Sequence, residues 1–161
     1  GSDVSWMQRG NYDPNFMSPT TDTQTITQVH QLLAEHGYDV QDLGADVLRV
    51  REVTTGVSFQ VALEGNVLFL TVALTTVPEA AVTPEIMRQM LAADNGISTS
   101  AFQLYSASEG KLAVTLNNFC TLQNMGSEDQ DDVLSCASYL MADLLHARQM
   151  FAEKLSSAQN A

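Results

Sequence analysis

Histidine is the side chain in this sequence that most readily binds a metal or transfers protons near neutral pH. The chain has three, His30, His36 and His146. Two zinc ligands on one helix lie four residues apart, whereas His30 and His36 are six apart and do not share a helix face. No carboxylate–histidine motif joins the three. The sequence therefore predicts surface or edge histidines and no metal centre.

Two cysteines, Cys120 and Cys136, could supply a nucleophile or a redox centre. Two are too few for a disulfide scaffold or a four-thiolate metal site. Cys136 lies near the apolar stripe of an expected helix, which favours a core residue over a nucleophile paired with a histidine. We expect Cys120 at the end of a strand and both thiols reduced, with a Cys120–Cys136 disulfide as the alternative.

Acidic residues crowd positions 128–132 and could suggest a Ca²⁺ site. They lack the alternating ligand spacing and central glycine of a Ca²⁺ loop, and the helix dipole explains acids at the start of a helix. The sequence also contains no glycine-rich phosphate loop, nucleophile elbow or dinucleotide fingerprint. We therefore predict a protein that is not an enzyme and takes no cofactor. The acids concerned are Glu128, Asp129, Asp131 and Asp132.

The composition is that of a folded, acidic chain. Hydrophobic residues make up 45% of the 161 residues and charged residues 16%, and the formal net charge is −12. Such an acidic excess argues against binding nucleic acid or an anionic membrane, because both attract positive charge. No apolar run approaches the roughly 20 residues of a membrane helix. We expect a cytoplasmic protein with a basic or polar protein partner.

Three helices are expected from local signals. Residues 23–36 have apolar side chains at helical spacing, and Gly37 can end that helix. Thr83 can cap a second helix that starts with Pro84 and ends near Asn95. Residues 127–130 match a capping box, followed by one continuous apolar stripe, so a long helix is expected over about 128–155.

Strands are expected where apolar residues alternate with polar ones. The alternation predicts strands near 47–51, 57–63 and 67–74, the last apolar on both faces as in a strand covered on each side or at a subunit contact. A hairpin is expected over 102–116, with its turn at Glu109-Gly110. The predicted order is α-β-β-β-α-β-β-α, an α+β fold with a mostly antiparallel sheet.

The expected domain organisation is simple. Residues 1–20 have no clear period and are predicted to be a flexible arm or a remnant of cloning, because Gly1-Ser2 resembles a cloning scar. The alternative is an arm that docks aromatic residues such as Trp6 onto a groove of this copy or of a neighbour. Residues 21–157 are predicted to form a single α+β binding domain and residues 158–161 a C-terminal tail.

This element order in a small acidic chain resembles the type III secretion chaperones of the Tir-chaperone type and the YbjN-like family, which share that fold. The first resemblance implies a cytoplasmic homodimer that holds an unfolded stretch of a secreted protein, with no nucleotide and no hydrolysis. The second implies a regulatory or stress-linked binding role. The resemblance covers about residues 23–155 and lies in the helix 26–33 with Gly37-Tyr38, the strand run 47–74, the helix 84–91 with Ala92-Ala93-Asp94-Asn95, the hairpin 104–116 and the terminal helix ending at Leu155.

We therefore predict a non-catalytic protein-binding module, most simply a homodimer, that holds an extended or partly unfolded partner segment. The alternative is a YbjN-like regulatory or stress-linked interaction domain. An extended peptide can add to a strand edge, and its side chains can fill grooves lined by adaptable methionines. Each methionine could equally be an ordinary core residue. The residues predicted for partner binding or dimer contact are Val67, Phe69, Thr71, Met87, Met90, Leu91, Phe102 and Leu104.

Overall fold

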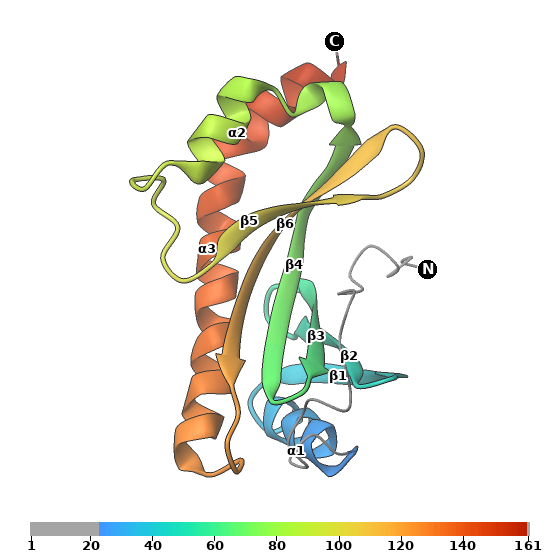
Figure 1. Cartoon of the computed structure of the whole chain (residues 1–161), viewed down its shortest axis with the longest axis vertical. Helices are drawn as coiled ribbons and strands as arrows, with labels where there is room; N and C mark the ends of the chain where they lie inside the picture. Colours follow the sequence, from blue (N-terminus) through green and yellow to red (C-terminus); the bar gives the residue numbers. More distant parts are fainter. Residues whose placement is uncertain (1–22, 161) are drawn as a thin grey trace. The chain divides into compact units, whose positions relative to one another are not determined.

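The structure, a computed structural model, describes residues 23–160 of the chain and the side chains of residues 25–155. The predicted arm over residues 1–20 lies outside the described residues. The elements, shown in Figure 1, are α1 (Thr23–Ala34), β1 (Tyr38–Gly44), β2 (Val47–Glu52), β3 (Ser58–Glu64), β4 (Val67–Pro78), the 3₁₀ helix η2 (Glu79–Ala81), α2 (Pro84–Leu91), β5 (Ala101–Ser106), β6 (Lys111–Thr121) and α3 (Ser127–Asn160).

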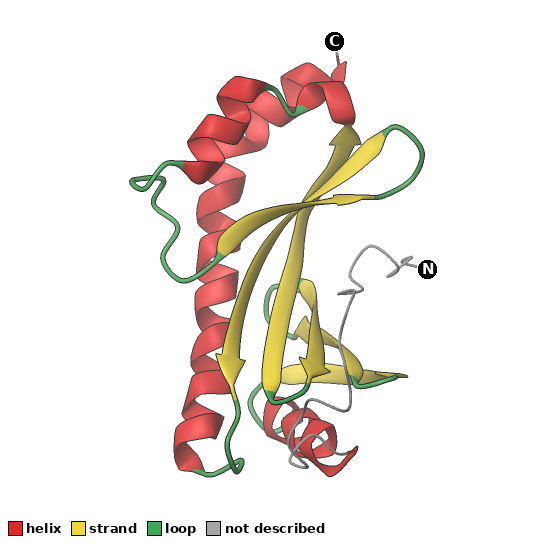
Figure 2. Cartoon of the chain, viewed as in Figure 1, coloured by secondary structure: helices red, strands yellow, loops and turns green. Residues whose placement is uncertain are grey.

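The fold is α+β, as predicted, with a six-stranded antiparallel sheet in the order β1-β2-β3-β4-β6-β5 (Figure 2). It contains one strand that the predicted order lacks, β1. The strand is largely exposed and carries Asp39 and Asp42, so its apolar alternation is limited to Tyr38 and Val40. Backbone pairing with β2 defines it instead, from Tyr38 opposite Glu52 onwards. A strand that is mostly exposed shows too little apolar alternation for a side-chain pattern to reveal it.

Contacts within the chain divide it into two compact units. The hairpin unit comprises residues 72–117 and 139–160, and the meander unit comprises residues 23–71 and 118–138. In the meander unit, α1 packs on β1 and β2, with Val29 and Leu33 fully buried. The rings of Tyr38 and Phe59 meet edge to face with their centroids 5.8 Å apart. The apolar face predicted for the first helix is therefore its packing face.

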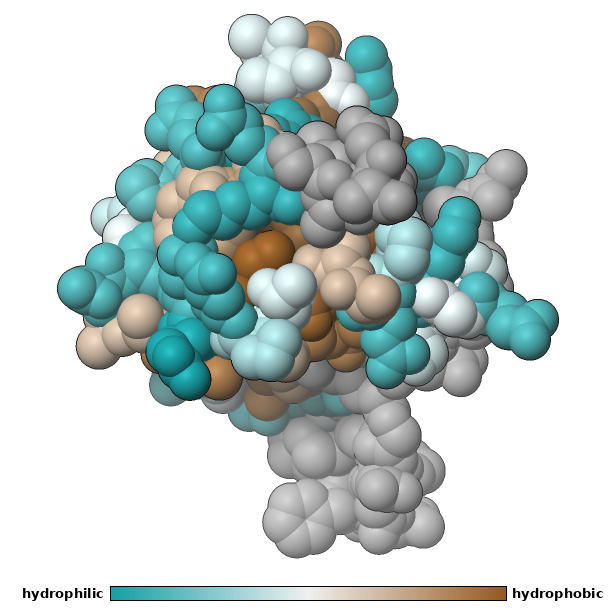
Figure 3. All heavy atoms as spheres, turned by 90° about the horizontal axis from the view of Figure 1, so that it is seen from above, coloured by the Kyte–Doolittle hydropathy of each residue, from teal (hydrophilic) through white to brown (hydrophobic). Residues whose placement is uncertain are grey.

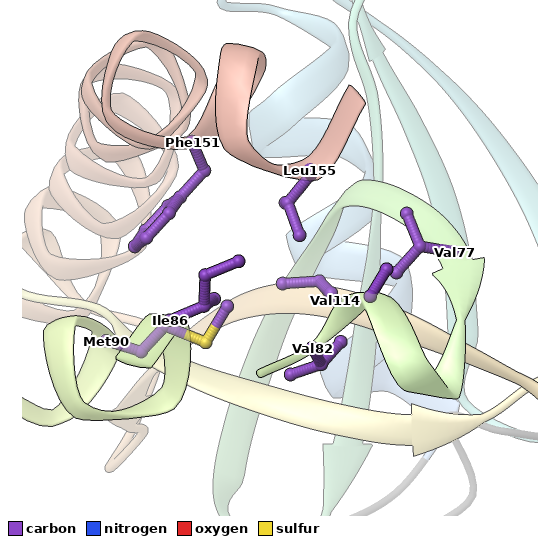
Figure 4. Close-up of a cluster of buried hydrophobic side chains, with 8 residues drawn as sticks. Val77, Val82, Ile86, Met90, Val114, Phe151 and Leu155 are labelled. Atoms are coloured by element: carbon purple, nitrogen blue, oxygen red, sulfur yellow. The ribbon is translucent and has the colours of Figure 1, made fainter. Parts of the chain in front are cut away.

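The hairpin unit has a core of its own (Figure 4). The ring of Phe151 on α3 is fully buried and meets Phe102 of β5 edge to face, with centroids 5.5 Å apart. This cluster fixes α2 against α3 and the hairpin, and burying a side chain of this kind contributes about 1.5–3 kcal/mol. The buried members are Val77, Ala81, Val82, Ile86, Met90, Val114, Phe151 and Leu155.

Helix α2 begins as its sequence predicts. The Thr83 hydroxyl accepts a hydrogen bond from the Ile86 amide at 3.2 Å, and Pro84 follows at the first helical position. The proline has no amide hydrogen to leave unpaired, and its fixed φ suits the helix. Near the end of the helix, Lys154 Nζ of α3 donates to Gln89 Oε1 at 2.7 Å.

The capping box predicted at the start of α3 is wrong. In a capping box the fourth residue donates its amide to the capping hydroxyl and returns its side chain to the cap. Here the Gln130 amide donates to the Gly126 carbonyl at 3.0 Å, and its side chain donates to the Met125 carbonyl at 2.9 Å. The loop before the helix folds back onto the first turn, with Met125 at φ 58°, so backbone carbonyls replace the serine hydroxyl as partners.

None of the helices between residues 23 and 160 has the length and the apolar character needed to cross a membrane.

Candidate binding edge of the sheet

Among the described residues, strand β5 lies at one end of the sheet order and is paired with β6 only. The register places Phe102 opposite Leu116, Leu104 opposite Val114 and Ser106 opposite Leu112. Over residues 23–160, no strand pairs with the side of β5 that faces away from β6, and this side is therefore a free strand edge. An edge of this kind offers main-chain donors and acceptors to another extended chain.

The register also shows which residues of β5 offer their backbone at that edge. Just beyond the strand, the Ala107 amide donates to the Lys111 carbonyl at 3.1 Å. Hydrogen-bonded and non-hydrogen-bonded pairs alternate along an antiparallel ladder. Phe102, Leu104 and Ser106 consequently occupy the non-hydrogen-bonded pairs, and their N–H and C=O groups point away from β6.

The two edges of the sheet differ in how they are protected. Edge strand β1 carries Asp39 and Asp42 and has an irregular register between Asp42 and Gly44. Charges and bulges are devices that keep an edge from pairing with another chain. Strand β5 reads Ala-Phe-Gln-Leu-Tyr-Ser, with no charged residue and no proline. The β5 edge therefore lacks the protection that β1 has.

A buried carboxylate holds the segment that leads into β5. Asp143 of α3 is 3% exposed. Its Oδ1 accepts hydrogen bonds from the amide and the hydroxyl of Ser98, both at 2.9 Å. Its Oδ2 accepts from the amides of Thr99 and Ser100 at 3.2 and 3.1 Å. Since this segment ends directly before Ala101, Asp143 sets where β5 begins.

The same contacts lower the pKa of Asp143. Burial by itself raises the pKa of this carboxyl, because it penalises the charged form. Hydrogen bonds from Ser98, Ser100 and Thr99 favour the charged form more strongly, so the net direction is downward. The group is a structural anion, and it is saturated by donors of its own chain.

Exposed apolar side chains lie on the elements of the hairpin unit. On α2, Met87 is 37% and Leu91 82% exposed. They are four residues apart and so share one helix face, beside the face that Ile86 and Met90 bury. Leu104 of β5 is 39% exposed. Viewed over α2 and the end of α3, apolar surface is framed by hydrophilic side chains (Figure 3).

The structure separates the eight residues predicted for partner binding. Within the hairpin unit, Met87, Leu91 and Leu104 are exposed, as a binding surface requires. Met90 belongs to the buried cluster, and Phe102 packs against it. Met90 is therefore a core residue, which is the alternative that the sequence left open for the methionines.

The other three predicted residues lie in the meander unit. Thr71 is 3% exposed, and Val67 and Phe69 are half-buried. Strand β4 is bonded on both sides, between β3 and β6, so it can contribute a face but not an edge. The Phe69 ring lies beside that of Phe119, with centroids 6.1 Å apart. Phe119 is 63% exposed and was not among the predicted residues. Its neighbours Asn118 and Cys120 are buried, and side chains alternate between the two faces of a strand.

Residues that could perform chemistry are dispersed. His30 and His36 belong to α1 and the turn after it, where His36 Nδ1 lies 2.8 Å from the Leu32 carbonyl. His146 lines an open hollow of about 360 Å³ in the hairpin unit, together with Asp94 and Asn95. Over residues 23–160, no three His, Cys, Asp or Glu side chains are grouped so that they could hold a metal ion.

A second buried carboxylate stands at the start of α3. Asp129 Oδ2 accepts the amides of Gln123, Asn124 and Met125 at 2.7, 2.9 and 2.8 Å. Burial raises the pKa of Asp129, but these three hydrogen bonds together lower it by more, so the net direction is downward. The sequence explained this acid by the helix dipole. The structure gives it a more specific partner, the loop between β6 and α3.

Comparison with known proteins identifies the fold. No protein-family model matches the sequence, and no curated protein matches it either. The described fold is similar to the crystal structure of YbjN, a proposed transcription regulator from E. coli. The TM-score is 0.58 at 15% sequence identity, over 78% of this chain and 92% of YbjN. The chain thus has a YbjN-like α+β fold, one of the two resemblances found in its sequence.

Proposed function

We propose that this chain is a non-catalytic protein-binding module that holds an extended segment of a partner protein against the free edge of β5. The observation that carries the proposal is the edge itself, with outward backbone groups at Phe102, Leu104 and Ser106 and no charged residue or proline. Strand addition draws its affinity from main-chain hydrogen bonds and its specificity from pockets for alternate side chains. Leu104 and the exposed pair Met87 and Leu91 supply apolar surface in the same unit.

The chemistry of the chain also defines the partner segment. The net charge is −12, so a segment with lysine or arginine among its apolar residues is favoured over an acidic one. Apolar residues at every second position suit strand addition, because they fall on one face of the added strand. The proposed ligand is therefore a basic, alternating apolar peptide in an extended conformation.

A regulatory module is the second candidate, and the likeness to YbjN favours it. The net charge of −12 disfavours direct binding to DNA, whose phosphates require positive charge. A regulatory role would then act through a folded protein partner. Such a partner need not use the strand edge, which allows the two candidates to be separated.

A homodimer is part of the proposal. A β5 strand from a second copy is itself an extended segment, and pairing of two β5 edges would complete both sheets. The dimer would then occupy the site of the peptide. Light scattering after size exclusion should show dimers that a binding peptide converts to peptide-bound monomers.

The decisive test uses Leu104, because its amide points to the free edge and not to β6. A ten-residue lysine and valine peptide serves as the probe, and an acidic peptide of the same pattern is its control. The variant Leu104→Pro removes the outward amide, whereas Leu104→Ala keeps the amide and removes the side chain. We expect Leu104→Pro to weaken binding by at least tenfold more than Leu104→Ala, with both variants folded by circular dichroism.

Hydrogen exchange locates the bound peptide independently. Protection confined to the amides of Phe102, Leu104 and Ser106 would support strand addition. Binding that protects other elements and is indifferent to Leu104→Pro would refute it. Binding of a folded partner by both Leu104 variants alike would favour the regulatory candidate.

A further inference from the structure

The two cysteines of the chain lie side by side in the meander unit. Cys120 ends the buried part of β6, and Cys136 is half-buried on α3. The Cys136 thiol donates to the Phe119 carbonyl at 3.5 Å, and that carbonyl carbon is bonded to the nitrogen of Cys120. The Asn118 side chain donates to the Cys136 carbonyl at 2.9 Å. Two hydrogen bonds therefore hold residue 136 against residues 118 and 119, directly before Cys120.

Each thiol also shifts the pKa of the other, chiefly through a side-chain hydrogen bond between them, which makes the two side chains neighbours. Both cysteines are free in the structure. A disulfide needs Cβ atoms about 3.5–4.5 Å apart, and the bond from the Cys136 thiol to the residue before Cys120 brings the two side chains toward that spacing. Oxidation would thus lock an arrangement that the reduced chain already has.

The two thiols are unequal in access and acidity. Cys120 is 9% exposed, whereas Cys136 is half-buried and more open to solutes. The hydrogen bond from Cys120 lowers the pKa of Cys136, against the opposing effects of burial and of Asp132. The same bond, followed by burial and the charges of Cys136, Asp132 and Asp129, raises the pKa of Cys120. Cys136 is therefore the attacking sulfur and Cys120 the resolving one, since the thiolate is the nucleophile.

We propose that Cys120 and Cys136 form a reversible intramolecular disulfide when the chain meets a hydroperoxide. The Cys136 thiolate attacks the terminal oxygen of the peroxide, breaks the O–O bond and becomes a sulfenic acid, while the alkoxide leaves, or hydroxide when the oxidant is hydrogen peroxide. The Cys120 thiol then attacks the Cys136 sulfur, the S–O bond breaks, and the hydroxyl leaves as water with the thiol proton. The two sulfurs lose two electrons in total, and the peroxide gains them. A dithiol reductant reverses the reaction.

The disulfide would tie the end of β6 to α3 and enclose residues 121–135. Closing a loop of this length restricts the unfolded chain, so the melting temperature should rise by about 5–10 °C on oxidation. All the residues involved belong to one unit. The inference is independent of the proposed binding edge.

Intact-mass spectrometry on the full chain tests the proposal. The protein is treated with hydrogen peroxide, then with an alkylating agent under non-reducing conditions. We expect the loss of two hydrogens, no alkylation, a monomer on a non-reducing gel and recovery of both thiols with dithiothreitol. In Cys120→Ser the resolving thiol is missing, so dimedone should trap a sulfenic acid on Cys136. In Cys136→Ser the remaining buried Cys120 should stay unmodified.

Three results would overturn the proposal. They are two alkylated thiols after peroxide, oxidation of Cys136 beyond the sulfenic acid in the wild-type chain, and a disulfide that joins two copies. The wild-type experiment decides the matter alone if a serine variant fails to fold.

Discussion

Replacing Asp143 by asparagine should destabilise the chain by about 2–3 kcal/mol at pH 7. The carboxylate accepts four hydrogen bonds from residues 98–100, two on each oxygen. Asparagine has the same shape, but its amide nitrogen must face one pair of donors, and the negative charge is lost. A hydrogen bond to a charged group contributes about 1.5–3 kcal/mol net and a neutral one about 1 kcal/mol. The contributions of the four hydrogen bonds do not add, because the donors of exposed Ser98 and Thr99 can bind water instead once the carboxylate is replaced.

The assay is urea denaturation followed by circular dichroism. Glu153→Gln is the matched control, because it removes one negative charge from an exposed position of the same helix. We expect the control to stay within about 0.5 kcal/mol of wild type. The urea dependence of the free energy of unfolding should be unchanged in both, so that a shift of the midpoint reports stability. Hydrogen exchange should also quicken in β5, whose entry segment Asp143 holds.

The pH dependence gives a second and independent check. The pKa of Asp143 is lowered in the folded chain, relative to an unfolded value of about 3.9. The stabilisation from this group is therefore fully present above that unfolded value and is lost as pH falls through the folded pKa. The difference between wild type and Asp143→Asn should shrink below about pH 4. A difference that is absent at pH 7, or that is the same at pH 7 and pH 3, would refute the reasoning.

Two further perturbations follow from the same structure. Asp129→Asn should lower stability by about 2 kcal/mol, because Asp129 accepts hydrogen bonds from three backbone amides. Urea denaturation at pH 7 measures this loss. A loss no larger than that of Glu153→Gln would contradict the prediction. Gly96→Ala should lower stability by about 1–2 kcal/mol, because φ is +82° and the added Cβ would overlap the His146 ring. In a His146→Ala background the overlap disappears but the backbone strain stays, so complete rescue in a double-mutant cycle would show that the strain has been overestimated.

Local chemistry made several elements predictable. Thr83 and Pro84 specify the start of α2 within one turn, and the structure places both as expected. The hairpin follows from alternating apolar residues on both sides of Gly110, which has φ 72°. In each case a few neighbouring residues determine the conformation. The boundaries that failed, such as the start of α3, depend on where a loop folds back.

The edge at β5 could not be predicted, because strand order is a property of the whole sheet. Chain order would place β5 beside β4, with β6 at the edge. In the structure β6 lies beside β4, and β5 is left outside. Leu104 could be predicted as a strand residue, but not as a residue with an outward backbone. The role of Asp143 depends on Ser98, which lies 45 positions away, and no spacing rule connects the two.

The buried acids bear on the choice between binding and catalysis. A general acid or base works best with a pKa near the operating pH and with a free oxygen that faces the substrate. Asp129 and Asp143 have the opposite properties, since their pKa values are lowered and their oxygens accept amides of their own loops. Protonating either one would loosen the fold before it could serve a reaction. Cys136 is the more reactive group, but its hydrogen bonds are with Cys120 and the backbone, and neither cysteine lines the hollow that contains His146. Within the described residues, the outward amides and carbonyls of β5 pair with no other strand, and the proposed addition of an extended chain would use these groups.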